Sequence, residues 1–252
     1  MKKALLFLPF LLISCKTVNN SSTEIDSEPV ARAYYLQKQA VEQQLDQDSI
    51  IGYKAGLTST AGQQKFSVNE PVAGVLFKSG LAFERNVYQL EHYQKLMLET
   101  EIGFILSQDI KQTVIQSNLS DYIERVVPAI ELPDLNYPDL SKVTGQILIQ
   151  TNVASNHVLI GKGKPFSEVS LNGIAAKLTR NGNLVISGHA NDAMGDQLVA
   201  LEWLINRLLK NGYSLKKGDL LITGALGKMI AAERGQYDAD FAQLGKLAFS
   251  IR

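Results

Sequence analysis

The chain has 252 residues, which suits one substantial domain with a small N-terminal extension. Lysine plus arginine number 25, and aspartate plus glutamate also number 25, so the formal net charge is zero. A neutral chain gives no support for nucleic-acid binding, which usually needs a basic patch or stripe. Hydrophobic residues make up 45% of the chain, as in an ordinary globular domain, and no run after the first residues predicts a transmembrane helix.

Residues 1–14 have the layout of a signal peptide. Two lysines precede an almost unbroken apolar run over residues 4–13, which is too short to span a bilayer. The run ends in Leu-Ile-Ser-Cys, which resembles the bacterial lipobox, where the cysteine becomes the first mature residue and carries lipid. The alternative is an ordinary signal peptide, but Cys15 is the only cysteine and stands at the required position. We therefore expect a protein of the bacterial cell envelope, anchored through lipid on Cys15 to the outer membrane or at a periplasmic face.

The residues after this signal predict a tether and two structural regions. Residues 15–29 are rich in Asn, Ser and Thr and contain few apolar residues, which indicates a lipidated, flexible tether. We expect a small N-terminal α/β region over residues 30–90 and a larger domain over residues 91–252.

Apolar spacing predicts the elements in chain order. Expected helices cover residues 30–47, 60–66 and 197–209, the last one capped by Asp196. Expected strands cover residues 50–57, 96–106, 125–132, 146–150, 157–160, 174–179, 183–187, 220–223 and 246–251. Many short strands that do not alternate regularly with helices predict a mixed, largely antiparallel β architecture with flanking helices.

Two glutamates share one face of the strand expected at residues 96–106. Glu99 and Glu101 are two residues apart, and their same-face neighbours are apolar or small, which suggests partial burial. Poorly solvated carboxylates repel each other, so one must take up a proton or a cation must lie between them. The alternative is a solvated edge strand with two ordinary surface glutamates.

A third carboxylate, Glu131, ends the apolar run of the strand expected at residues 125–132. A strand end is a usual place for a ligand, although a polar strand terminus is the plainer interpretation. Ligands that are all oxygen favour Mg²⁺, Mn²⁺ or Ca²⁺. Glu99, Glu101 and Glu131 are therefore the candidate metal ligands.

Lys54 lies in the apolar, glycine-flanked strand expected at residues 50–57. It is either a buried cation for an anionic substrate or part of the solvent face of an edge strand. The three histidines, His92, His157 and His189, are far apart and lack metal-ligand spacing. No nucleophile elbow, phosphate loop or dinucleotide fingerprint occurs in the sequence.

Four short segments carry a resemblance to a known family. Residues 52–59 are Gly-Tyr-Lys-Ala-Gly-Leu-Thr-Ser, residues 99–104 are Glu-Thr-Glu-Ile-Gly-Phe, and residues 128–131 are Pro-Ala-Ile-Glu. Residues 218–227 are Gly-Asp-Leu-Leu-Ile-Thr-Gly-Ala-Leu-Gly. In this order they resemble motifs of the 2-keto-4-pentenoate hydratases, in the fumarylacetoacetate hydrolase superfamily. The resemblance runs over residues 30–252, which makes it more specific than any one motif.

The resemblance implies a fold, a metal and a reaction. The fold class is α/β (α+β), with a small N-terminal α/β region and a mixed β-sandwich roll of the fumarylacetoacetate hydrolase type. The implied ion is Mg²⁺ or Mn²⁺, with Ca²⁺ as an alternative in crystals, and the implied assembly is a homo-oligomer. The implied substrate is a small 2-oxo or 2-hydroxydienoic acid, and the reaction adds water to 2-hydroxypenta-2,4-dienoate. Lys54 would pair with the substrate carboxylate or donate a proton.

This chain also departs from the family pattern. Family hydratases carry an acidic residue, a candidate general base, where this chain has Ser79, so position 79 is a second candidate catalytic site. The family segment Asp-Asn-Ala-Ser is Asn-Val-Ala-Ser at residues 152–155, and Gln197 replaces a proline at a helix start. Three alternatives stay open: a sister 2-oxo-3-enedioate decarboxylase, an acylpyruvate C–C hydrolase, and a non-catalytic metal- or ligand-binding lipoprotein.

Overall fold

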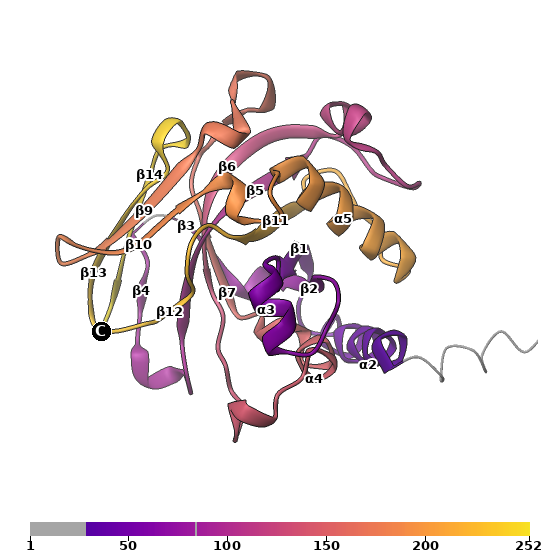
Figure 1. Ribbon diagram of the computed structural model, residues 1–252, viewed down its shortest axis with the longest axis horizontal. Coiled ribbons are helices and arrows are strands. Elements are labelled where there is room, and N and C mark those ends of the chain that lie inside the picture. Colours follow the sequence, from indigo (N-terminus) through magenta and orange to yellow (C-terminus); the bar gives the residue numbers. More distant parts are fainter. Residues whose placement is uncertain (1–28, 84) are drawn as a thin grey trace, which may run out of the picture.

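The computed structural model describes residues 29–83 and 85–252 (Figure 1). The predicted signal peptide, the lipid site at Cys15 and the tether up to residue 28 lie outside the described residues. Within the described part of the chain, no helix has the length and apolar character needed to cross a membrane.

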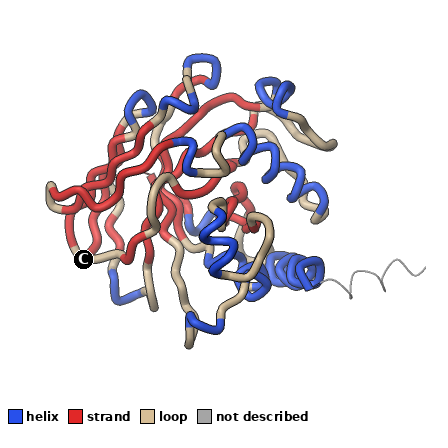
Figure 2. The backbone as a smooth tube through the Cα atoms, in the orientation of Figure 1, coloured by secondary structure: helices blue, strands red, loops and turns tan. Residues whose placement is uncertain are grey.

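Nine strands of the described chain form one curled, mixed sheet (Figures 1 and 2). Its main path runs β2-β1-β11-β5-β6-β7-β3, while β12 pairs with β5 and β8 pairs with β6. The strands are β1 (Ile50–Gly56), β2 (Val72–Phe77), β3 (Leu81–Phe83), β5 (Met97–Leu106), β6 (Ile123–Leu132), β7 (His157–Ile160), β8 (Lys164–Pro165), β11 (Leu220–Ala225) and β12 (Ile230–Ala231).

A second sheet of five described strands lies beside the first, in the order β10-β9-β13-β14-β4. Its strands are β4 (Val87–Tyr88), β9 (Ala175–Arg180), β10 (Asn183–His189), β13 (Gly235–Asp240) and β14 (Lys246–Ile251). β9 and β10 form a hairpin, pairing antiparallel around a tight turn at Asn181 and Gly182.

Four α-helices of the described chain cover the curled sheet. They are α2 (Pro29–Gln44), α3 (Thr60–Lys65), α4 (Gly145–Gln150) and α5 (Gln197–Lys210). Helix α5 begins as predicted, because the Asp196 carboxylate accepts the Leu198 N–H at 2.7 Å. Its apolar side packs against β11, and α2 packs against α4.

Two apolar clusters fill the molecule. The larger one joins both sheets and the helices, with Phe104, Leu178 and Leu204 among its fully buried members. The smaller one lies on the other face of the curled sheet and contains Val127 and Ile222. Burial of both faces explains why the central strands are continuous apolar runs.

The fold-class prediction is confirmed, and most predicted elements lie within a few residues of their observed ends. The strand predicted at residues 146–150 is wrong, because this segment is helix α4. Thr144 caps it by accepting the Ile147 N–H, and only one side of the turn is buried. A short apolar run with β-branched residues does not by itself separate helix from strand.

The two predicted structural regions share one sheet. Strands β1, β2 and β3, from residues 30–90, belong to the same curled sheet as β5 and β6. β11, from late in the chain, lies between β1 and β5. Residue 90 therefore does not separate two cores.

Candidate metal centre

Three glutamates converge on the face of the curled sheet that carries the smaller apolar cluster. β5 and β6 pair antiparallel, with Glu99 directly opposite Glu131 and Glu101 opposite Ala129. Strand alternation therefore places all three side chains on one face. One carboxylate oxygen from each lies within 4.8 Å of the others. Glu101 and Glu131 are each 1% exposed, and Glu99 is half-buried.

The floor beside these glutamates is apolar and tightly packed. A Cβ added to Gly103 would lie 2.8 Å from side-chain atoms of both Leu220 and Val127. Val127 and Leu220, together with Ile222, form part of the smaller cluster. This packing keeps water away from one side of the carboxylates and strengthens the electrostatic interactions among them.

Burial and mutual repulsion favour protonation of two of the carboxyls. Burial is the main cause that raises the Glu99 pKa to about 7, and repulsion from Glu131 adds to it against the attraction of Lys54. The Glu101 pKa is raised well above its ordinary value, again first by burial and then by Glu131 and Glu99. The cluster therefore takes up protons readily at neutral pH when no cation is bound.

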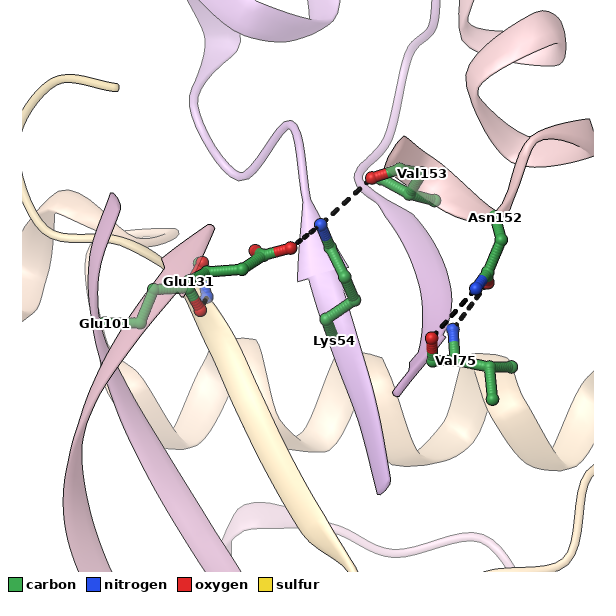
Figure 3. A network of polar contacts seen from close by, with 7 residues as sticks. Lys54, Val75, Glu101, Glu131, Asn152 and Val153 are labelled. Carbon is green, nitrogen blue, oxygen red and sulfur yellow. Dashed lines mark hydrogen bonds and ion pairs between the residues drawn. The ribbon is translucent and has the colours of Figure 1, made fainter. Parts of the chain in front are cut away.

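Lys54 supplies a buried cation to this cluster. It is 2% exposed, and its ammonium forms an ion pair with Glu131 Oε1 and donates to the Val153 carbonyl at 3.0 Å (Figure 3). Burial opposes the charge, but attraction to Glu131 and Glu99 outweighs it and raises the Lys54 pKa above its usual value. β1 lies between β2 and β11, so the edge-strand alternative for Lys54 is wrong.

The contact between Lys54 and Glu131 also indicates how the sheet is curved. These residues lie on β1 and β6, which β11 and β5 separate in the sheet order. Four neighbouring strands of a flat sheet would place the outer two about 14 Å apart. The side chains meet because this face is concave.

Two backbone groups complete the surroundings of the cluster, and sequence reasoning identified neither. Gly224 donates its N–H to Glu101 Oε2 at 2.8 Å. Gly224 has φ +108°, and an added Cβ would lie 2.3 Å from Thr58 Oγ1, so the site requires glycine. The second group is the Val153 carbonyl, in the turn η5 (Asn152–Ala154). The departure noted at residues 152–155 was the only sequence signal for it.

Ser79, the second predicted catalytic position, contacts a different acid, and its catalytic role stays a prediction. Ser79 is exposed in the turn η1 (Lys78–Gly80), and its hydroxyl donates to the Asp48 carboxylate. Gly74, the β2 residue that pairs with Lys54, lies five residues earlier, or about 15 Å of chain. The candidate base position is thus occupied by a serine that contacts an acid of the loop between α2 and β1.

The glutamate trio fits a hard divalent cation. It is the only group of three or more potential metal-binding side chains found within residues 29–83 and 85–252. Among these residues, no hydrogen-bond partner satisfies Glu131 Oε2, although this oxygen is fully buried. A buried carboxylate oxygen without a partner is costly, and a cation between the glutamates would remove that cost. An oxygen-only donor set suits Mg²⁺, Mn²⁺ or Ca²⁺.

The site is a carboxylate cluster beside one buried lysine on a curled sheet, and comparison with known proteins gives the family of this chain. Residues 49–252 match the family described as Fumarylacetoacetate (FAA) hydrolase C-terminal. Since this match spans most of the chain, the protein belongs to the fumarylacetoacetate hydrolase family.

Individual relatives narrow this assignment. The chain is 31% identical over 196 residues to the 2-keto-4-pentenoate hydratase of Paraburkholderia xenovorans, covering 74% of this chain and 70% of the relative. It is 28% identical over 205 residues to 2-keto-4-pentenoate hydratase 1 of Dechloromonas aromatica, covering 79% and 76%. The protein is an enzyme of this hydratase group.

A solved structure shares the fold. The 4-oxalocrotonate decarboxylase from Pseudomonas putida G7, complexed with magnesium and adipate, superposes with a TM-score of 0.84. The match covers 92% of this chain and 89% of the decarboxylase chain, at 21% sequence identity. At this identity the likeness establishes the architecture alone.

Proposed function

We propose that this hydratase adds water to a short 2-hydroxydienoic acid of the 2-hydroxypenta-2,4-dienoate class, giving a 4-hydroxy-2-oxo acid. The observation that carries the proposal is the convergence of Glu99, Glu101 and Glu131 with Lys54 on a concave, water-excluding face. The names of the two hydratase relatives supply the substrate class.

The three glutamates would hold Mg²⁺ or Mn²⁺. When bound, such an ion supplies Lewis-acid polarisation of the substrate's 2-oxo and carboxylate oxygens. Glu101 is fixed in place for this role by the Gly224 N–H. The unpaired oxygen of Glu131 points to the same use.

Lys54 would orient the substrate through its carboxylate. An ammonium has three donors, and Glu131 and Val153 accept two of them. The third donor is available for a substrate carboxylate, as a charge-assisted hydrogen bond. The apolar floor at Val127 and Ile222 limits water beneath the cluster and strengthens this interaction.

The activity assay also distinguishes two alternatives, a decarboxylase and a non-catalytic lipoprotein. A 2-oxo-3-enedioate decarboxylase shares the fold, but at lower identity than the hydratases. A non-catalytic lipoprotein would keep the ion site without turnover. Purified protein with Mg²⁺ or Mn²⁺ should consume 2-hydroxypenta-2,4-dienoate, followed by its ultraviolet absorbance, and form 4-hydroxy-2-oxopentanoate. Release of CO₂ from a 2-oxo-3-enedioate without hydration would favour the decarboxylase, and metal binding without any turnover would favour the lipoprotein.

We further propose that the enzyme is exported and anchored by lipid on Cys15. The support is the charged and apolar pattern of residues 1–14 ahead of the only cysteine. Cys15→Ala should release the protein from the membrane fraction or block its processing. Recovery of wild-type protein from the cytoplasm with an uncleaved Met1 would contradict the anchor.

A further inference from the structure

The Lys54 ammonium contacts Glu131 and the Val153 carbonyl, and the backbone that carries this carbonyl has an unusual conformation. Its carbonyl partner, Val153, lies in a turn where three successive residues have φ near +53°. Left-handed conformations are rare for non-glycine residues and are outliers for a β-branched residue such as valine. Such a conformation persists only where surrounding contacts enforce it, and it often marks a functional site.

The Asn152 side chain enforces this turn. Its amide accepts the Val75 N–H at 2.7 Å and donates to the Val75 carbonyl at 2.9 Å (Figure 3). Val75 lies on β2, which ends the main path of the curled sheet. Asn152 thus pairs with backbone groups that no strand satisfies on that side, and it ties the turn to the strand beside Lys54.

Further contacts tie the rest of the turn to the loop that follows Glu131. The Asp134 N–H donates to the Ala154 carbonyl at 3.1 Å. One residue before the turn, the Thr151 hydroxyl lies 2.6 Å from the Tyr137 hydroxyl. The turn is therefore fixed to the strand beside Lys54 on one side and to the segment after Glu131 on the other.

Two glycines give the turn room to reach Lys54. A Cβ on Gly74 would lie 3.0 Å from the Asn152 carbonyl oxygen, 3.1 Å from Lys54 Cγ and 3.2 Å from Val153 Cβ. A Cβ on Gly56 would lie 2.8 Å from Val153 Cγ1. Side chains at these positions would separate the turn from β1 and β2.

We propose that Asn152 is a positioning residue for Lys54, acting through the Val153 carbonyl in a slot left open by Gly74. The carbonyl accepts one N–H of the ammonium while Glu131 accepts another, and this fixes the orientation in which the third donor serves the substrate. The inference rests on the proposed function, which assigns Lys54 to the substrate carboxylate. Asn152 itself makes no contact with the glutamates and acts only through the lysine.

The structure offers a matched control, a second asparagine whose side-chain amide bonds both backbone groups of one distant residue. Asn206, on α5, accepts the Val114 N–H at 2.9 Å and donates to the Val114 carbonyl at 2.9 Å. Like Asn152, it is half-buried. Asn206→Ala therefore removes the same pair of hydrogen bonds at a place that does not contact Lys54.

The test compares Asn152→Gly, Asn152→Ala and Gly74→Ala with Asn206→Ala and the wild type. Glycine at 152 tolerates the left-handed backbone and removes only the amide, whereas alanine adds conformational strain. The measurements are Mn²⁺ binding by calorimetry, binding of 2-oxopentanoate to the Mn²⁺-loaded protein, and KM and kcat for the dienoate. 2-Oxopentanoate is a saturated substrate analogue and has no carbon–carbon double bond for the enzyme to hydrate.

We expect the Asn152 and Gly74 variants to bind 2-oxopentanoate about tenfold more weakly, with a raised KM, because one charge-assisted hydrogen bond is misplaced. Their Mn²⁺ affinity should stay within about twofold of wild type, and Asn206→Ala should change neither affinity. If Gly74→Ala fails to fold, Asn152→Gly alone decides the question.

The outcomes separate the two proposals. Wild-type protein that binds neither Mn²⁺ nor 2-oxopentanoate contradicts the proposed function. Wild-type protein that binds both, with Asn152→Gly indistinguishable from it, overturns the positioning role alone. Equal losses of Mn²⁺ and 2-oxopentanoate binding in Asn152→Gly would show that Asn152 is structural and would also overturn it.

Discussion

Two lysine–carboxylate pairs in this molecule have similar chemistry in opposite surroundings. Lys54 and Glu131 meet inside the concave face, where side-chain exposure is 3% and 1%. Lys246 and Asp240 face each other across β13 and β14 at 3.2 Å, with exposures of 78% and 48%. An exposed pair contributes little because water and salt screen it, whereas burying charges costs free energy that only good partners offset. The buried pair therefore needs a functional reason to exist, and the exposed pair does not.

Removing one partner from each pair should give the largest contrast. Lys54→Met leaves Glu131 buried without its cation, and we expect a loss of about 3 kcal/mol in the free energy of unfolding. Lys246→Met should change it by no more than about 0.5 kcal/mol. Denaturant unfolding of metal-free protein at pH 8 measures both. Equal effects of the two substitutions would contradict the contrast.

The same comparison applies to metal affinity. Glu101→Gln removes one charged ligand from the candidate cage but keeps the side-chain volume, and we expect Mn²⁺ affinity to fall about 100-fold or more. Asp240→Asn removes a carboxylate of the exposed pair and should leave the affinity unchanged. Calorimetric titration of each variant with Mn²⁺ checks this, and undiminished binding by Glu101→Gln would remove that residue from the site.

The buried glutamate cluster and the exposed pair should also change folding stability in opposite directions as pH rises. The Glu99 pKa is raised to about 7, so folding of the metal-free protein favours the protonated form, and stability falls as pH rises from about 4.5 to 7. The Asp240 pKa is lowered, first by the Ala242 N–H, so its contribution is lost as pH falls. Mn²⁺ must displace the Glu99 proton, and its affinity should rise about fivefold or more from pH 6 to 7. A pH-independent Mn²⁺ affinity over this range would contradict the raised pKa.

The smallest expected effect concerns position 79. A carboxylate there would face Asp48, the present partner of the Ser79 hydroxyl, and would lie outside the glutamate cluster. Ser79→Asp should therefore not raise the hydration rate. A gain in kcat would show that this turn reaches the substrate during the reaction, and an assay with the dienoate at saturating Mn²⁺ decides it.

Sequence patterns predicted the structural features that depend on residues close together in the chain. Two-residue alternation placed Glu99 and Glu101 on one face, and Asp196 marked the start of α5 because its carboxylate acts two residues away. The hydrogen bonds between the Asn152 side chain and the Val75 backbone join residues 77 positions apart, and no local sequence pattern predicts them. The left-handed turn is likewise a result of tertiary contacts.

Gln197 illustrates the same limit. Its replacement of the family proline was visible in the sequence, but its purpose was not. In the structure, its side chain is fully buried, donates to the Ala190 carbonyl at 2.6 Å, and accepts the Thr223 hydroxyl at 2.6 Å. The substitution thus links the start of α5 to β11 through groups from distant parts of the chain.

The position of β11 between β1 and β5 has a consequence for the order in which the molecule can form. β1 and β2 can pair early as a hairpin, but they join the remaining sheet only through β11, which is synthesised near the end. Until then, β1 and β5 both present unpaired edges, which are prone to incorrect pairing with other chains. Pairing across so much of the sequence also slows folding, to the milliseconds-to-seconds range typical of non-local β topologies. A growing chain of this enzyme therefore depends on protection from aggregation for most of its synthesis.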